Sequence, residues 1–168
     1  MAQRAGLEHS VKPVRELFSR RRRENNSLVL IMGAKNMDKY QQIREVGTNG
    51  DNYDLSTEDL IEQFQYWDAQ YGLELSDIEF DAVTVTFNDL PEDLTELAIE
   101  IYEFCPDVID QHFGCMADAI AVAEEFNQPL SDEIQVLLKD IDLTDEDYGF
   151  ELLKRSLSIH KAITLWWD

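Results

Sequence analysis

The spacing of apolar residues changes twice between residues 56 and 105, and this change constrains the fold more than any other feature of the sequence. A first apolar group recurs at helical spacing and stops at a glycine; it comprises Leu60, Ile61, Phe64, Trp67 and Tyr71, with Gly72 after it. Apolar and polar residues then alternate through residues 80–87, which is the period of a half-buried strand. A second helical group follows and stops at Pro106; it comprises Leu94, Leu97, Ala98, Ile101 and Cys105. The chain is therefore expected to combine helices with a sheet.

Capping residues and β-branched runs place further elements. Ser56 and Asp59 have the spacing of a capping box, so a helix is expected to begin directly after Ser56. The runs at 27–33 and 162–167 are short and rich in apolar and β-branched residues, which predicts strands. Three more helical patterns lie between residues 116 and 157, and the last is expected to begin at Thr144.

The short segment LEL at 73–75 precedes the run at 80–87 and is counted as a further strand. Without the middle helices, the predicted order is then strand, helix, strand, strand, helix, strand. This is the order of a ferredoxin-like unit, so we predict an α+β fold: a ferredoxin-like antiparallel sheet with helices on one face. Residues 114–142 would be an extra helical insertion before the last helix and strand. We expect residues 1–26 to form a basic N-terminal helical segment and residues 27–168 to form a single α+β domain.

Charge is distributed very unevenly along the chain. Seven of the fourteen basic residues lie in the first 24 positions, whereas no Lys or Arg occurs between Arg44 and Lys139. That same stretch contains 24 of the 35 acidic residues, and the formal net charge of the chain is −21. A surface of this sign repels nucleic acid and anionic membrane and attracts basic proteins, although a high net charge also serves solubility alone. We therefore expect a basic protein partner and no direct binding of nucleic acid or membrane.

Compartment and cofactor expectations follow from the same composition. Two cysteines make no disulfide framework, no apolar run reaches the roughly 20 residues needed to span a bilayer, and the first residues lack a secretory pattern. No glycine-rich phosphate loop, serine elbow or paired-histidine motif occurs. The sequence thus predicts a cytoplasmic protein without a cofactor or catalytic residues, and it does not exclude a homo-oligomer.

The segment CPDVIDQHFGC, residues 105–115, is the strongest candidate for chemistry. Cys105, His112 and Cys115 could bind zinc, since the metal accepts thiolate and imidazole ligands. Structural zinc sites usually combine two pairs of ligands two to four residues apart, whereas these spacings are seven and three and no second pair occurs elsewhere in the sequence. Cys105 also continues the buried stripe of the preceding helix, where a free cysteine behaves as a small apolar residue. Metal binding is therefore the alternative and not the main prediction.

Five residues are candidate binding residues. They are Asp107, Asp110, Gln111, Trp166 and Trp167. Asp107 and Gln111 either cap backbone amides or face a pocket beside the tryptophans. The two tryptophans should point to opposite faces of the last strand, so one is expected in the core and the other either covered by a helix or exposed at a contact.

Three segments resemble a bacterial family known only as a domain of unknown function. These are YWDAQYGLEL at 66–75, YEFCPDVIDQ at 102–111 and the terminal WWD at 166–168. The resemblance covers about residues 47–168 and implies a small α+β fold with no agreed activity, so it transfers no functional residue. Members commonly have glycine where this chain has His112, and they run more directly into the closing helix and strand.

The leading expectation is a non-catalytic acidic binding protein, of the immunity or antitoxin type, that inhibits or regulates a basic partner. The alternative is a small metal-binding protein or enzyme that uses the cluster from Cys105 to Cys115.

Overall fold

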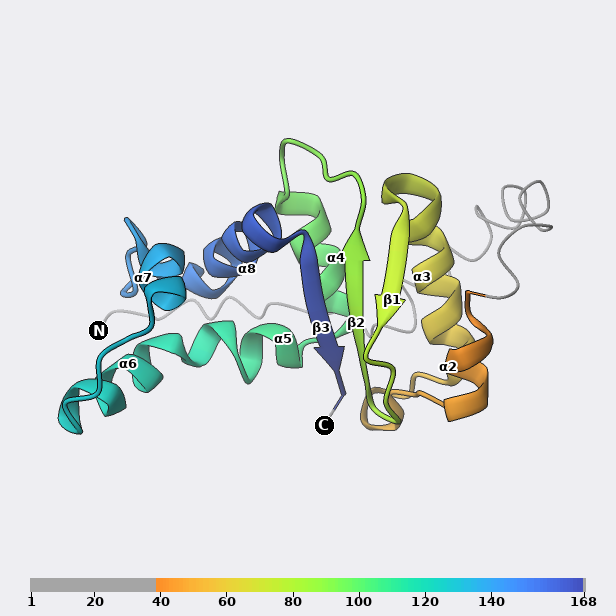
Figure 1. The fold of residues 1–168 in the computed structure, drawn as a ribbon, viewed down its shortest axis with the longest axis horizontal. Helices are drawn as coiled ribbons and strands as arrows, with labels where there is room; N and C mark the ends of the chain where they lie inside the picture. Colours follow the sequence, from red (N-terminus) through yellow and green to blue (C-terminus); the bar gives the residue numbers. More distant parts are fainter. Residues whose placement is uncertain (1–38, 168) are drawn as a thin grey trace, which may run out of the picture. The chain divides into compact units, whose positions relative to one another are not determined.

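The computed structural model describes residues 39–167, which form a mixed α+β fold around a three-stranded antiparallel sheet. The strands are β1 (Leu73–Ser76), β2 (Ala82–Phe87) and β3 (Ala162–Trp166), in the order β1-β2-β3 (Figure 1). Leu73 lies opposite Phe87, and Val85 lies opposite Ile163. The expected basic segment at 1–26 and strand at 27–33 lie outside the described residues.

The helices surround this sheet and are named by their order in the chain. They are α2 (Gln41–Val46), α3 (Thr57–Tyr71), α4 (Thr95–Phe104), α5 (Asp107–Asp110), α6 (Met116–Glu125), α7 (Asp132–Leu138) and α8 (Tyr148–His160), with the short 3-10 helices η1 (Asp51–Tyr53) and η2 (Phe113–Cys115). The capping box before α3 is confirmed: the Ser56 side chain accepts a hydrogen bond from the backbone of Asp59, and the Asp59 side chain accepts one from the backbone of Ser56. These bonds satisfy amides that a helix start leaves without partners.

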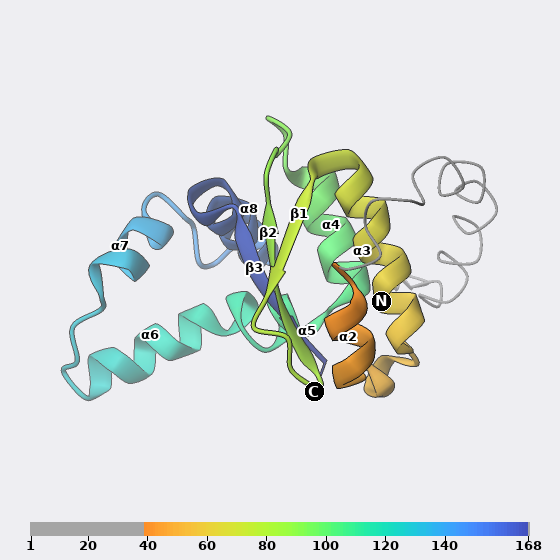
Figure 2. The ribbon, with the colours of Figure 1, turned by 45° about the vertical axis from the view of Figure 1, so that its right-hand side comes forward.

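One face of the sheet is buried against helices. Alternation along β2 buries Val83, Val85 and Phe87, while the residues between them are half-buried. In Figure 2, α3 and α4 lie together on one side of the sheet. The core between them is aromatic: the ring of Trp67 in α3 meets Phe104 in α4 edge-on, with centroids 5.4 Å apart. A helical layer on one face of an antiparallel sheet is thus confirmed.

The ferredoxin-like detail of the expectation is not confirmed. In such a split unit another strand separates the two strands that a helical crossover joins. Here β2 and β3 are direct antiparallel neighbours, with Thr84 opposite Thr164. Figure 1 shows the reason: α4 leads the chain back along the sheet after β2, and α8 then returns it to the start of β3. Because α4 and α8 run in opposite directions between the two strands, β3 can lie antiparallel beside β2.

The last helix begins later than expected, which corrects the predicted start at Thr144. Asp142 accepts hydrogen bonds from both the backbone amide and the hydroxyl of Thr144, at 2.9 and 2.7 Å. This local turn holds residues 142–144 out of the helix, and α8 begins at Tyr148. Aspartate competes for nearby backbone amides in this way and favours turns.

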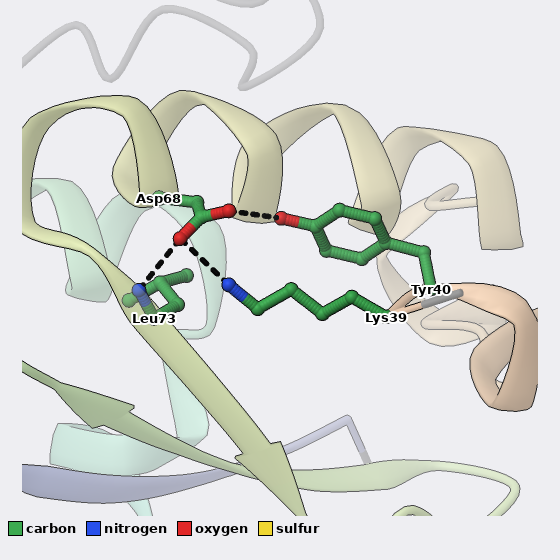
Figure 3. A network of polar contacts seen from close by, with 4 residues as sticks. All are labelled: Lys39, Tyr40, Asp68 and Leu73. Atoms are coloured by element: carbon green, nitrogen blue, oxygen red, sulfur yellow. Dashed lines mark hydrogen bonds and ion pairs between the residues drawn. The ribbon is translucent and has the colours of Figure 1, made fainter. Parts of the chain in front are cut away.

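A partly buried carboxylate joins the beginning of the described chain to the sheet. Asp68, near the end of α3, accepts hydrogen bonds from the backbone amide of Leu73 and from Lys39 Nζ, both at 2.7 Å, and from the Tyr40 hydroxyl at 3.2 Å (Figure 3). Burial of Tyr40 raises the pKa of its phenol above the ordinary value, and the neighbouring Asp68 raises it further. Three segments therefore meet at one carboxylate.

Helices α6 and α7 form an arm that extends from the domain between η2 and α8. Both helices lie within residues 114–142, the expected helical insertion. The main contact of α6 is with η2, and that of α7 is with α8. The two ends of the arm meet: a Cβ on Gly149 would lie 2.9 Å from Ile109 Cγ2 and 3.3 Å from the backbone of Gly114. Only glycine at 149 permits this approach without displacement. None of the helices within residues 39–167 is long and apolar enough to cross a bilayer.

Candidate functional site

The Cys105 segment is part of the core, because it is attached to the end of the last strand. Cys105 follows α4 and is fully buried, and its thiol donates a hydrogen bond to the backbone carbonyl of Trp166 at 2.9 Å. The Trp167 indole donates in return to the carbonyl of Phe104 at 3.0 Å, and its ring packs edge-on against Phe104. These reciprocal bonds join the end of α4 to the end of β3. The expectation that Cys105 continues the apolar stripe is confirmed.

Asp107 is also buried, at 2% exposed, and takes part in side-chain hydrogen bonds. Its Oδ1 accepts one from the Tyr53 hydroxyl at 2.6 Å and one from Gln111 Nε2 at 2.7 Å. Burial raises the pKa of the Tyr53 phenol, and the hydrogen bond to Asp107 adds to the effect. This is a third arrangement besides the expected cap and the expected open pocket. The carboxylate connects η1 to α5 across 54 positions of the chain.

The exposed part of the segment lies beyond Asp107. Asp110 and Gln111 are exposed, and the Tyr102 hydroxyl donates to Asp110 at 3.3 Å. The His112 ring meets Trp166 edge-on, with centroids 5.9 Å apart, and partial burial there lowers the pKa of the imidazole below its ordinary value. A neutral imidazole against a half-buried indole is consistent with packing. Of the five candidate binding residues, Asp110, Gln111 and Trp166 are thus accessible.

The two remaining candidates are not accessible. Asp107 and Trp167 are 2% and 3% exposed, so neither can touch a partner in this conformation. The predicted division of the two tryptophans is confirmed, with Trp167 in the core and Trp166 half-buried. Strand alternation accounts for it, since successive side chains point to opposite faces.

The three residues of the zinc alternative have separate environments. The thiol of Cys105 bonds to β3, whereas Cys115 is exposed and its thiol donates to the backbone carbonyl of Asp110 at 3.2 Å. Among residues 39–167, no three His, Cys, Asp or Glu side chains come together as ligands for a metal ion. Burial raises the pKa of Cys105 to about 12, which keeps its thiol protonated at neutral pH. A protonated buried thiol is a poor nucleophile.

The contrast between the two cysteines predicts their reactivity. In the native protein at pH 8, we expect a disulfide reagent such as DTNB to modify one thiol rapidly, because only Cys115 is exposed. The second thiol should react only after unfolding in urea. Release of thionitrobenzoate against time gives both equivalents directly. The matched variants are Cys115→Ser, which should lose the rapid phase, and Cys105→Ser, which should keep it. Two rapid equivalents in the native protein would contradict the assignment.

The carboxylates of the described surface have few cationic neighbours. Ion pairs join Lys39 to Asp68 at 2.7 Å, Arg44 to Glu58 at 2.8 Å, and Lys154 to Glu151 at 2.6 Å. The other exposed carboxylates include three groups: the turn between β1 and β2 (Asp77, Glu79, Asp81), the entry to α4 (Glu92, Asp93, Glu96), and the arm (Asp118, Glu124, Glu125, Asp132, Glu133). Glu133 of the arm lies 3.5 Å from His160 of α8. We call these three groups the acidic surface.

The fold and the Cys105 segment define a small α+β domain whose Cys-Pro-Asp and Trp-Trp segments are bonded to one another inside the core. Residues 30–168 match the model of the family described as Domain of unknown function (DUF4253), and the chain belongs to that family. A search of curated proteins and a search of solved structures found no match. Membership agrees with the resemblance of the three segments and extends it toward the N-terminus.

Sequence reasoning missed the partner of Asp107. Tyr53 lies in a turn-rich segment, GTNGDNYD, whose glycines and asparagines predict backbone geometry alone. No local pattern connects a phenol at 53 with a carboxylate at 107, because the contact depends on how η1 docks against α5. The one available indication was the aspartate directly after a helix-ending proline, a position from which a side chain can point back to the core.

Proposed function

We propose that this protein is a non-catalytic binding protein of the bacterial cytoplasm that engages a basic protein through its acidic surface, as an immunity protein, an antitoxin or a regulator does. The observation that carries the proposal is the stretch from 45 to 138, which has 24 acidic residues and no Lys or Arg. Exposed carboxylates in the three groups of the acidic surface give that stretch a surface of one sign.

Electrostatic complementarity supports binding mainly through the rate of association. Opposite potentials steer two proteins together and raise the association rate above the roughly 10⁵–10⁶ M⁻¹s⁻¹ of neutral pairs. Like-charged partners are excluded by the same field. The packing of Cys105 and Asp107 supports the non-catalytic part of the proposal, since both groups are used in bonds that hold the core together.

The test is capture of partners on the immobilised full chain at about 50 mM and about 500 mM salt, because added salt shortens the reach of exposed charges. We expect a protein rich in Lys and Arg to be retained at the lower concentration and released at the higher. Its association rate, measured by surface plasmon resonance, should fall by about tenfold or more across this range of salt concentrations.

A matched variant separates surface charge from shape. Neutralising the turn between β1 and β2 by Asp77→Asn, Glu79→Gln and Asp81→Asn keeps side-chain size and removes three charges. We expect slower association with an unchanged dissociation rate. If no basic protein is retained at low salt, or if the association rate is independent of salt, the proposal fails.

A further inference from the structure

Helix α6 exposes an apolar stripe that the described residues leave without a partner. Val122 is 53% exposed and Phe126, at the C-terminal end of the helix, is 66% exposed. Ala119 lies one turn before Val122 and is also exposed. Spacings of three and four residues place these three side chains on one face of the helix. A stripe of this kind on a soluble protein is typical of an interaction surface.

The stripe is separate from the face by which α6 meets the rest of the domain. Met116 is buried and Ile120 is half-buried, and these positions lie on the side where the helix contacts η2. The helix is thus apolar on two sides, and only one of them is covered within residues 39–167. Both figures of the ribbon show α6 extending away from the sheet, at the left of each view (Figures 1 and 2).

Charge next to the stripe selects among possible occupants. Asp118 and Glu125 are exposed and lie four residues before and three residues after Val122, so both border the stripe. Neither has an ion pair with another residue of the described chain. Pairing of α6 with α6 of a second copy would bring four such carboxylates together, with no Lys or Arg on either helix to offset them. Like charges in contact disfavour that arrangement.

We propose that the Ala119, Val122 and Phe126 stripe docks an amphipathic helix of a basic partner, whose apolar residues pack on the stripe while its Lys or Arg residues face Asp118 and Glu125. Recognition of an amphipathic helix by an apolar surface with complementary charge is a common mode of peptide binding. The ten residues of α6 are about 15 Å long, which matches about three turns of a partner helix. This inference rests on the proposed function and assigns the place where the partner binds.

The first test measures binding of a fluorescently labelled peptide of leucine and lysine, designed as an amphipathic helix of about five turns, by fluorescence anisotropy with the full chain. A peptide with glutamate in place of lysine is its control. We expect the lysine peptide alone to bind. The double variant Val122→Ser, Phe126→Ser should weaken binding about tenfold or more, since such anchors carry most of an interface's affinity.

Phe80 provides a matched control, because it is 61% exposed and has Glu79 and Asp81 beside it. Phe80→Ser should change peptide affinity less than about twofold, as expected outside an anchor position. Asp118→Lys with Glu125→Lys leaves the stripe intact and should also weaken binding, so the inference stays testable if the serine variant folds poorly. Circular dichroism checks folding in each case.

Three results would overturn the inference. The lysine peptide could fail to bind the wild-type chain, it could bind the stripe and charge variants as tightly as the wild type, or light scattering could show a dimer that the stripe variant abolishes. The capture experiment separates the two proposals. A basic protein retained equally by wild type and stripe variant would overturn the docking site and leave the proposed function in place, whereas failure of wild type to retain any would remove the function itself.

Discussion

Trp67→Ala should lower the free energy of unfolding by about 4 kcal/mol, the largest effect expected of a single substitution in this chain. Trp67 is completely buried, and its ring packs edge-on against Phe87 and Phe104. Its indole donates a hydrogen bond to the buried carboxylate of Glu100 at 3.0 Å. Alanine would leave a cavity between α3, α4 and the sheet and remove that donor. Urea unfolding followed by far-ultraviolet circular dichroism measures the change.

Trp67→Phe is the control that keeps an aromatic ring and removes the indole donor. We expect it to cost about 1–2 kcal/mol, because a buried acceptor then loses one hydrogen bond. Combining it with Glu100→Gln should give a coupling of at least about 0.5 kcal/mol if the two side chains interact directly. A loss below about 1 kcal/mol for Trp67→Ala would show that the aromatic cluster contributes far less than its burial indicates.

Asp107→Ala should lower the free energy of unfolding by about 2–3 kcal/mol. The substitution removes the acceptor of both the Tyr53 hydroxyl and the Gln111 amide, and it leaves a small void beside a buried turn. The bond between Tyr53 and Asp107 is part-buried, so water replaces it only in part. Urea unfolding measures this effect, and peptide and partner binding of the variant are measured under conditions where it remains folded.

Asp110→Ala is the matched control, since Asp110 belongs to the same short helix, is exposed, and accepts from Tyr102 at 3.3 Å. Its loss should change stability by less than about 0.5 kcal/mol. The pair distinguishes a structural carboxylate from a binding one. If Asp107→Ala kept full stability and lost binding of a basic partner, Asp107 would be a functional residue and our description of the core would be wrong.

Local chemistry accounts for most of the elements that could be predicted. The capping box at Ser56 and the alternation around Val85 involve neighbours in sequence, and both are observed as expected. The same holds for Trp167, which directly follows β3 and whose burial continues the alternation of Ile163 and Leu165. Such features depend on residues within a few positions of one another, so a single sequence contains the needed information.

Features that depend on distant contacts could not be predicted. The bond between Tyr53 and Asp107 requires the docked positions of η1 and α5, and the thiol of Cys105 finds its acceptor 61 positions away at Trp166. The neighbouring arrangement of β2 and β3 depends on the paths of α4 and α8, which periodicity does not specify. The predicted helix start at Thr144 was wrong for a local reason. Asp142 accepts a hydrogen bond from the backbone amide of Thr144 and holds that segment in a turn.

The close approach of Gly114 and Gly149 means that the arm leaves and re-enters the domain at a single point. Tyr148 strengthens this junction, since its hydroxyl contacts the carbonyl of Gly114. A segment whose two ends already meet can lengthen, shorten or change sequence while the sheet and its helical layer keep their geometry. In evolutionary terms, the arm can change in length and sequence, whereas the hydrogen-bonded Cys-Pro-Asp and Trp-Trp segments hold the framework that carries it.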